Sequence, residues 1–65
     1  MMPKYDIDVK LVGNDGNAFA IIGSVTKALR KAGVKKEEID KYSEEAMSGD
    51  YDHLLRTSME WVNVS

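Results

Sequence analysis

The feature that most constrains this chain is the spacing of its apolar residues, which differs from one segment to the next. A glycine lies close to each boundary between such segments. Residues 5–12 (YDIDVKLV) alternate apolar and polar side chains, with Val12 as the exception. This period of two is typical of a β-strand that buries one face. After the turn residues 13–17 (GNDGN) the spacing becomes helical, which predicts one short strand followed by helices.

Residues 17–32 form the first predicted helix. We expect one buried stripe at helical spacing, made of Phe19, Ile21, Ile22, Val25, Ala28, Leu29 and Ala32. Gly23 lies inside this helix, where glycine costs about 1 kcal/mol, so we expect another backbone to approach it closely. Gly33 is expected to end the helix in a left-handed conformation, with Val34 making the apolar contact that such ends favour.

Two more helices are predicted on either side of Gly49. The first covers residues 36–48, carries Glu37 and Glu38 in its first turn, and has as its expected inward side chains Ile39, Tyr42, Ala46 and Met47. The second begins after Asp50, a good N-terminal cap. Its expected buried stripe consists of Tyr51, Leu54, Leu55, Ser58 and Met59.

The tail, residues 61–64 (WVNV), has strand propensity, so the predicted order is β-α-α-α-β. We therefore predict an α+β fold in which three short helices pack on a two-stranded sheet formed by the chain ends. Residues 1–65 are expected to form a single compact domain. The direction of pairing stays open: if each element reverses the direction of the one before it, the two strands are parallel, whereas small helix crossings give antiparallel strands.

Size and composition limit the function. The chain has 65 residues and no cysteine, so a domain this small must be stabilised by packing, alone or with self-association. Its longest apolar run, residues 18–22, is far too short to span a membrane, and its beginning lacks a signal-peptide core. We expect a cytoplasmic protein that needs no cofactor and no metal. We also expect no enzyme activity, because so short a chain has little volume for a pocket that excludes water.

Four segments together resemble a group of short, uncharacterised bacterial proteins, some of them linked to phage or mobile elements. These segments are Asp15–Phe19 (DGNAF), Ala28–Gly33 (ALRKAG), Gly49–Leu55 (GDYDHLL) and Trp61-Val62 (WV). The likeness covers residues 7–64, nearly the whole chain. It implies a compact stand-alone protein, and it transfers no functional residue because the group has no assigned activity.

Two groups of residues are candidate binding sites, one for a metal ion and one for an anion. Asp50, Asp52 and His53 offer metal-ligating groups, but neighbours on a helix point in different directions, so a helix cap explains them better. The Gly-x-x-Gly of residues 13–16 lies between a strand and a helix, where free amides bind anions. It lacks both phosphate-binding fingerprints and carries Asp15, which favours a simple turn.

A run of basic residues near the end of the first helix is the main electrostatic feature. Residues 1–36 hold seven basic and three acidic residues, whereas residues 37–65 hold two and eight. The basic run consists of Lys27, Arg30, Lys31, Lys35 and Lys36. A phosphate backbone can dock on such a helix face. The isoelectric point of about 5.2 lies far below that of a typical nucleic-acid-binding domain, so weak anion or nucleic-acid binding is the alternative function, and nucleic acid is not the partner that we expect.

Aromatic and valine side chains supply the candidate protein interface. We expect this interface at Tyr5, Val12, Trp61 and Val64, because a two-stranded sheet leaves an unpaired edge and Trp and Tyr are enriched at interfaces. Whether Trp61 lies in the core or on the surface stays open. The function that we predict is a small non-enzymatic protein-interaction module that binds a partner protein or a second copy of itself.

Overall fold

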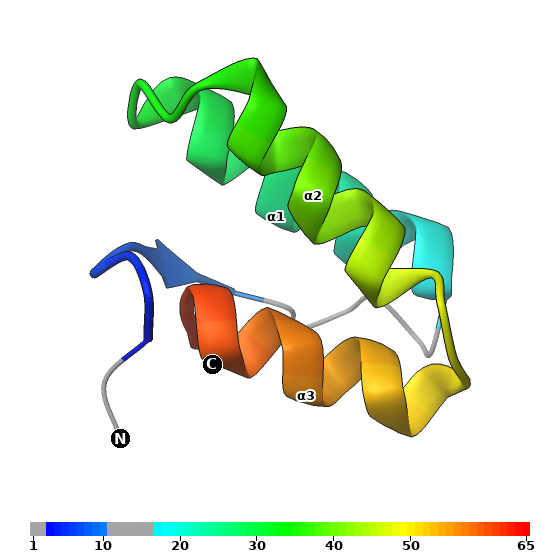
Figure 1. Ribbon diagram of the computed structural model, residues 1–65. Helices are drawn as coiled ribbons and strands as arrows, with labels where there is room; N and C mark the ends of the chain where they lie inside the picture. Colours follow the sequence, from blue (N-terminus) through cyan, green and yellow to red (C-terminus); the bar gives the residue numbers. More distant parts are fainter. Residues whose placement is uncertain (1–2, 11–16) are drawn as a thin grey trace.

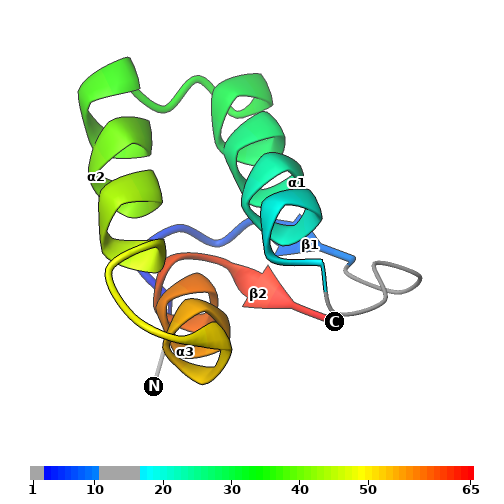
Figure 2. The same cartoon turned by 90° about the vertical axis from the view of Figure 1, so that its right-hand side faces the viewer.

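The two ends of the chain meet in a small sheet, and three helices connect them. The computed structural model describes residues 3–10 and 17–65. Its elements in order are β1 (Asp8–Val9), α1 (Ala18–Lys31), α2 (Lys36–Ala46), α3 (Tyr51–Trp61) and β2 (Asn63–Val64). Helices α1 and α2 form one layer, while α3 and the sheet lie beneath them (Figures 1 and 2). The predicted α+β fold, with its order β-α-α-α-β, is confirmed.

The sheet is parallel, which decides the question that the sequence left open. Asp8 pairs with Asn63 and Val9 pairs with Val64. The backbone N–H groups of Asn63 and Ser65 donate to the carbonyls of Ile7 and Val9 at 2.8 and 3.0 Å. Each helix runs back along the element before it (Figure 1), and β2 runs back along α3, so four reversals leave the two strands pointing the same way.

The first strand is shorter than the sequence predicts, although its alternation is real. Tyr5 and Ile7 are half-buried and Val9 is buried, while the polar residues between them are exposed. Before β1 the chain bonds to the end of α3, since the Tyr5 N–H donates to the Trp61 carbonyl at 2.9 Å. Only Asp8 and Val9 pair as a strand, and residues 11–12 of the predicted strand lie outside the described residues.

The core lies between the two layers. Tyr42 on α2 and Val25 and Leu29 on α1 have no exposed surface. The other buried apolar residues are Val9, Ile21, Ile39, Ala46, Leu54 and Val62. Every element except β2 contributes to this set, so the helices and the sheet are stabilised by one shared core.

The helix ends follow the local signals in the sequence. Asn17 caps α1 by accepting from the Phe19 and Ala20 N–H groups at 3.0 and 3.3 Å. Gly33 has a φ of 85°, and the Val34 N–H donates to the Leu29 carbonyl at 3.0 Å, as a left-handed helix end requires. The predicted helix end at Gly33 is confirmed.

Four large apolar residues that the sequence assigned to buried stripes are exposed instead, and so is Ala32. The exposed fractions of the four large residues are Phe19 78%, Met47 57%, Met59 54% and Tyr51 39%. Phe19 lies about 200° around the helix axis from Ile21, whose side faces the core. On α3 the buried face is centred on Leu54, Thr57 and Ser58, which turns Met59 outward. Met47 and Tyr51 flank the turn between α2 and α3.

The reason that the sequence suggested for Gly23 is wrong. A Cβ atom built at Gly23 meets no atom within 4 Å among the described residues, so no close backbone approach requires glycine there. None of the helices in residues 3–10 and 17–65 has both the length and the hydropathy to span a bilayer.

Candidate functional site: an apolar cleft at the turn between α2 and α3

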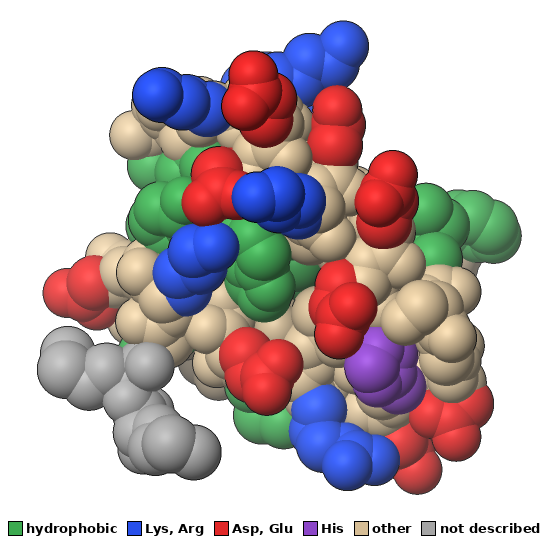
Figure 3. All heavy atoms as spheres, in the orientation of Figure 1, with side chains coloured by type: hydrophobic (Ala, Val, Ile, Leu, Met, Phe, Trp, Pro, Cys, Tyr) green, Lys and Arg blue, Asp and Glu red, His purple; other side chains and the backbone are tan. Residues whose placement is uncertain are grey.

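The exposed apolar side chains gather around one hollow. A cleft of about 330 Å³ lies where α1 begins, α2 ends and α3 begins. Its lining residues are Ala18, Phe19, Ile22, Ala46, Met47, Gly49, Asp50, Tyr51 and Leu54. In Figure 3 hydrophobic side chains project at the right-hand edge, beside the beginning of α1 and the end of α2. Of the four large apolar residues that are exposed in the described part of the chain, three therefore share one surface: Phe19, Met47 and Tyr51.

The chemistry of the cleft is that of an apolar binding surface. Ala46 and Leu54 are buried and Ile22 is half-buried, so they form its floor. Asp50 is the one charged residue among the described lining residues, and its Oδ1 accepts from the His53 N–H at 2.9 Å as the cap of α3. Such a surface can bind apolar side chains, and its charged group is already used within the fold.

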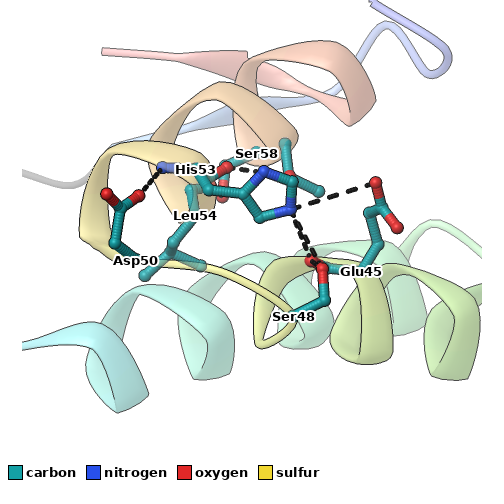
Figure 4. Close-up of polar contacts among 7 residues, drawn as sticks. Glu45, Ser48, Asp50, His53, Leu54 and Ser58 are labelled. Atoms are coloured by element: carbon teal, nitrogen blue, oxygen red, sulfur yellow. Dashed lines mark hydrogen bonds and ion pairs between the residues drawn. The ribbon is translucent and has the colours of Figure 1, made fainter.

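His53 fastens the turn beside the cleft (Figure 4). Its Nε2 lies 2.9 Å from the Glu45 carbonyl oxygen and 3.1 Å from the Ser48 Oγ. The Ser48 hydroxyl also donates to the Glu45 carbonyl, at 2.7 Å. Because a carbonyl oxygen only accepts, Nε2 carries the proton in this arrangement. His53 therefore adds a further hydrogen bond to a carbonyl near the end of α2 that already accepts from the hydroxyl and the N–H of Ser48.

Position 49 requires glycine because the His53 side chain leaves no space for a Cβ atom there, and not because of its backbone conformation. A Cβ atom at Gly49 would lie 2.8 Å from the Cγ and 2.9 Å from the Cβ of His53. Gly33 is the described glycine with positive φ, so Gly49 serves a different purpose. The sequence marked both glycines as helix ends, and the structure shows that the second one makes room for an imidazole.

The structure does not bring Asp50, Asp52 and His53 together as metal ligands. The Asp50 carboxylate caps α3, and the His53 ring turns back towards α2 (Figure 4). Within residues 3–10 and 17–65, no group of three or more His, Cys, Asp or Glu side chains is arranged to hold an ion. The Gly-x-x-Gly motif of residues 13–16 lies outside the described residues.

Two of the predicted interface residues form an aromatic cluster at the end of α3. The Trp61 ring stacks on Tyr5 at 5.9 Å between centroids and meets the edge of Tyr42 at 5.7 Å. The Lys4 Nζ lies 4.3 Å from the centre of the Trp61 ring, close enough for a cation–π contact. Tyr5 and Trp61 are half-buried and pack against the core, so Trp61 lies between core and surface.

The valines of the predicted interface have different positions. Val64 is half-buried in β2 and packs against the core. Val12 lies outside the described residues.

A buried pair of hydroxyl groups joins α2 to α3 behind this cluster. The Tyr42 hydroxyl lies 2.7 Å from the Ser58 Oγ, and Ser58 donates to the Leu54 carbonyl at 2.9 Å. Since Ser58 has one proton, Tyr42 is the donor of the shared bond. Burial raises the pKa of Tyr42, and its hydrogen bond to Ser58 opposes this effect.

The predicted basic run is exposed, and the structure divides it. Lys27 and Lys31 line a groove beside β1, whereas Lys35 and Lys36 lie at the beginning of α2. Arg30 lies in the last turn of α1. None of these five residues forms an ion pair with another described residue.

Acidic side chains are spread over α2 and around His53 on the face in Figure 3. Glu38 on α2 pairs with Lys4 at 3.1 Å and with Lys41 at 3.5 Å. The hydrogen bond from Lys4 lowers the pKa of the Glu38 carboxyl, with further help from the charges of Lys4 and Lys41, while desolvation opposes the shift.

Comparison with protein-family models, with curated proteins and with solved structures found no match to this chain. The resemblance to short bacterial proteins stays a prediction. Function must therefore be argued from the geometry of this chain.

Proposed function

We propose that this chain is a non-enzymatic protein-interaction module and that the apolar cleft is its docking surface. The exposure of Phe19, Met47 and Tyr51 around one hollow carries this proposal. Single apolar residues on a surface are ordinary, but apolar residues that gather around a hollow mark interaction sites. Aromatic residues and methionine are also the residue types that protein interfaces favour.

A second copy of the chain is the occupant that we propose. Phe19 is 78% exposed and stands at the rim of the cleft, while the floor beside it is apolar and concave. A two-fold contact brings the same surface of both copies together, so each Phe19 enters the cleft of the other copy. A domain of 65 residues buries a small share of its surface, and a dimer adds to that burial.

Sedimentation equilibrium from micromolar to millimolar protein tests this proposal. We expect a monomer–dimer equilibrium that Phe19→Ser weakens about a hundredfold or more. Burying one such side chain contributes about 1.5–3 kcal/mol, and a symmetric dimer buries two. Met47→Ser should also weaken the dimer.

Met59→Ser is the matched control. Met59 is 54% exposed and Met47 is 57% exposed, but Met47 lines the cleft and Met59 does not. A wild-type protein that stays monomeric throughout, or equal weakening by the two methionine variants, would contradict self-association through the cleft.

A further inference from the structure

A second hollow runs along the free edge of β1. It has a volume of about 320 Å³ and shares no described lining residue with the apolar cleft. Its lining residues are Asp8, Val9, Lys10, Ser24, Lys27, Ala28 and Lys31. These residues come from β1, the residue after it and one flank of α1. Because no residue of β2 lines it among those described, the groove lies on the side of β1 away from β2.

The backbone of β1 has hydrogen-bonding groups that face this groove. Ile7 and Val9 turn their carbonyls to β2, where they accept from Asn63 and Ser65. Backbone groups along a strand alternate between its two edges. The N–H and C=O of Asp8 therefore point away from β2, towards the groove. No described residue forms a backbone hydrogen bond with them, and an edge of this kind is a template for a further strand.

The groove is also positively charged. Lys10, Lys27 and Lys31 are exposed, and none of them forms an ion pair with another described residue. Lys27 and Lys31 are four residues apart on α1, so they lie on one face of the helix. Asp8 is the one acidic residue among the described lining residues.

We propose that this groove binds an extended acidic peptide segment of a partner protein, which adds a strand to β1. The peptide backbone pairs with Asp8, and its carboxylates meet Lys10, Lys27 and Lys31. Main-chain pairing supplies affinity in this mode of recognition, and the flanking side chains supply selectivity. This proposal does not depend on the apolar cleft.

A peptide fits the groove better than a nucleic acid does. A phosphate backbone offers only acceptors, so it has no donor for the Asp8 carbonyl. A peptide strand offers donors and acceptors in alternation, which matches the edge of β1.

Titration of the wild-type chain with synthetic heptapeptides, followed by amide NMR, tests the proposal. In the first peptide glutamate alternates with valine, in the second lysine replaces glutamate, and the third is the acidic peptide with alternate backbone nitrogens methylated. We expect the acidic peptide to shift the Asp8 and Lys10 amide signals and to slow hydrogen exchange at Asp8. The lysine peptide and the methylated peptide should bind at least tenfold more weakly.

Two charge variants separate the groove from general attraction. Lys27→Gln together with Lys31→Gln should raise the Kd of the acidic peptide about fivefold, since exposed ion pairs contribute modestly. Lys35→Gln together with Lys36→Gln makes the same change in charge outside the groove. This pair should raise the Kd of the acidic peptide less than twofold at 0.1 M salt.

Several results would overturn the proposal. Equal binding of the methylated peptide would show attraction by charge without strand pairing. Tighter binding of a single-stranded thymidine oligonucleotide would assign the lysines to nucleic acid. Slower Asp8 exchange with rising protein concentration alone would assign the edge to a second copy. Absence of any shift at millimolar acidic peptide would remove the site, and none of these results bears on dimerisation through the apolar cleft.

Discussion

Alanine at Gly23 and alanine at Gly49 should change stability in opposite directions, although the two substitutions are chemically the same. Gly23 is exposed inside α1, and a Cβ atom there meets no described atom within 4 Å. Alanine is better than glycine in a helix interior by about 0.8–1 kcal/mol. Gly23→Ala should therefore raise the free energy of unfolding by about 1 kcal/mol and the Tm by about 4–8 °C.

At Gly49 the same methyl group has no space. It would lie 2.8–3.0 Å from the Cγ, Cβ and Cδ2 atoms of His53, and the first two are close to the backbone of α3. Relief requires α3 to shift or the imidazole to leave the Glu45 carbonyl, which it meets at 2.9 Å. Overpacking of this kind costs about 1–3 kcal/mol, so Gly49→Ala should lower the free energy of unfolding by that amount.

Thermal and urea unfolding, followed by far-ultraviolet circular dichroism, measure both effects. A double-mutant cycle with His53→Ala identifies the cause at Gly49, because that change removes the Cγ and Cδ2 contacts and leaves the Cβ contact at 2.9 Å. The cost of alanine at position 49 should then fall without vanishing. A stabilising Gly49→Ala, a destabilising Gly23→Ala, or an unchanged cost in the His53→Ala background would refute this reasoning.

Two further predictions concern the buried hydroxyl pair and the ion pair of Glu38. Tyr42→Phe should cost about 0.5–1.5 kcal/mol, because it removes the donor to Ser58. Burial raises the pKa of Tyr42 above 10.0, so the unfolded chain ionises first and the wild type loses stability as pH rises past 10. Alkaline urea unfolding should show a flatter profile for Tyr42→Phe, and an identical slope would contradict the assignment. The pKa of Glu38 is lowered from 4.5, so the unfolded chain takes up its proton first and stability falls as pH drops below this value. Glu38→Gln should reduce that acid sensitivity in a pH series of Tm values, whereas an equally steep decline would show that other carboxylates cause it.

The parts of the fold that the sequence predicts are those that depend on local chemistry. Asn17, Gly33 and Asp50 mark helix ends through bonds to residues within a few positions, so one short segment contains the whole signal. The sequence left the direction of strand pairing open. The parallel pairing agrees with a chain that reverses between each of its five elements, because four reversals return it to its first direction.

The rotation of a helix about its axis is different, because its neighbours decide it. On α3 the core contains Thr57 and Ser58, not Met59. This is possible because Thr57 donates to the His53 carbonyl at 2.8 Å and Ser58 bonds to Leu54 and Tyr42. Hydroxyl groups satisfied in this way can be buried at little cost. No pattern within α3 alone shows that Tyr42 supplies the partner.

The errors in predicted burial are themselves informative about the site. Periodicity assigned Phe19, Met47 and Tyr51 to buried faces of three different helical segments, and all three are exposed. Independent errors would scatter over the surface, as Met59 does, but these three meet around one cleft. Where local rules fail together at one place, a function that requires the exception is the expected cause. Replacing Phe19 or Met47 by serine should therefore leave the fold intact, because the core is complete without them, and any loss should appear in association and not in the stability of the monomer.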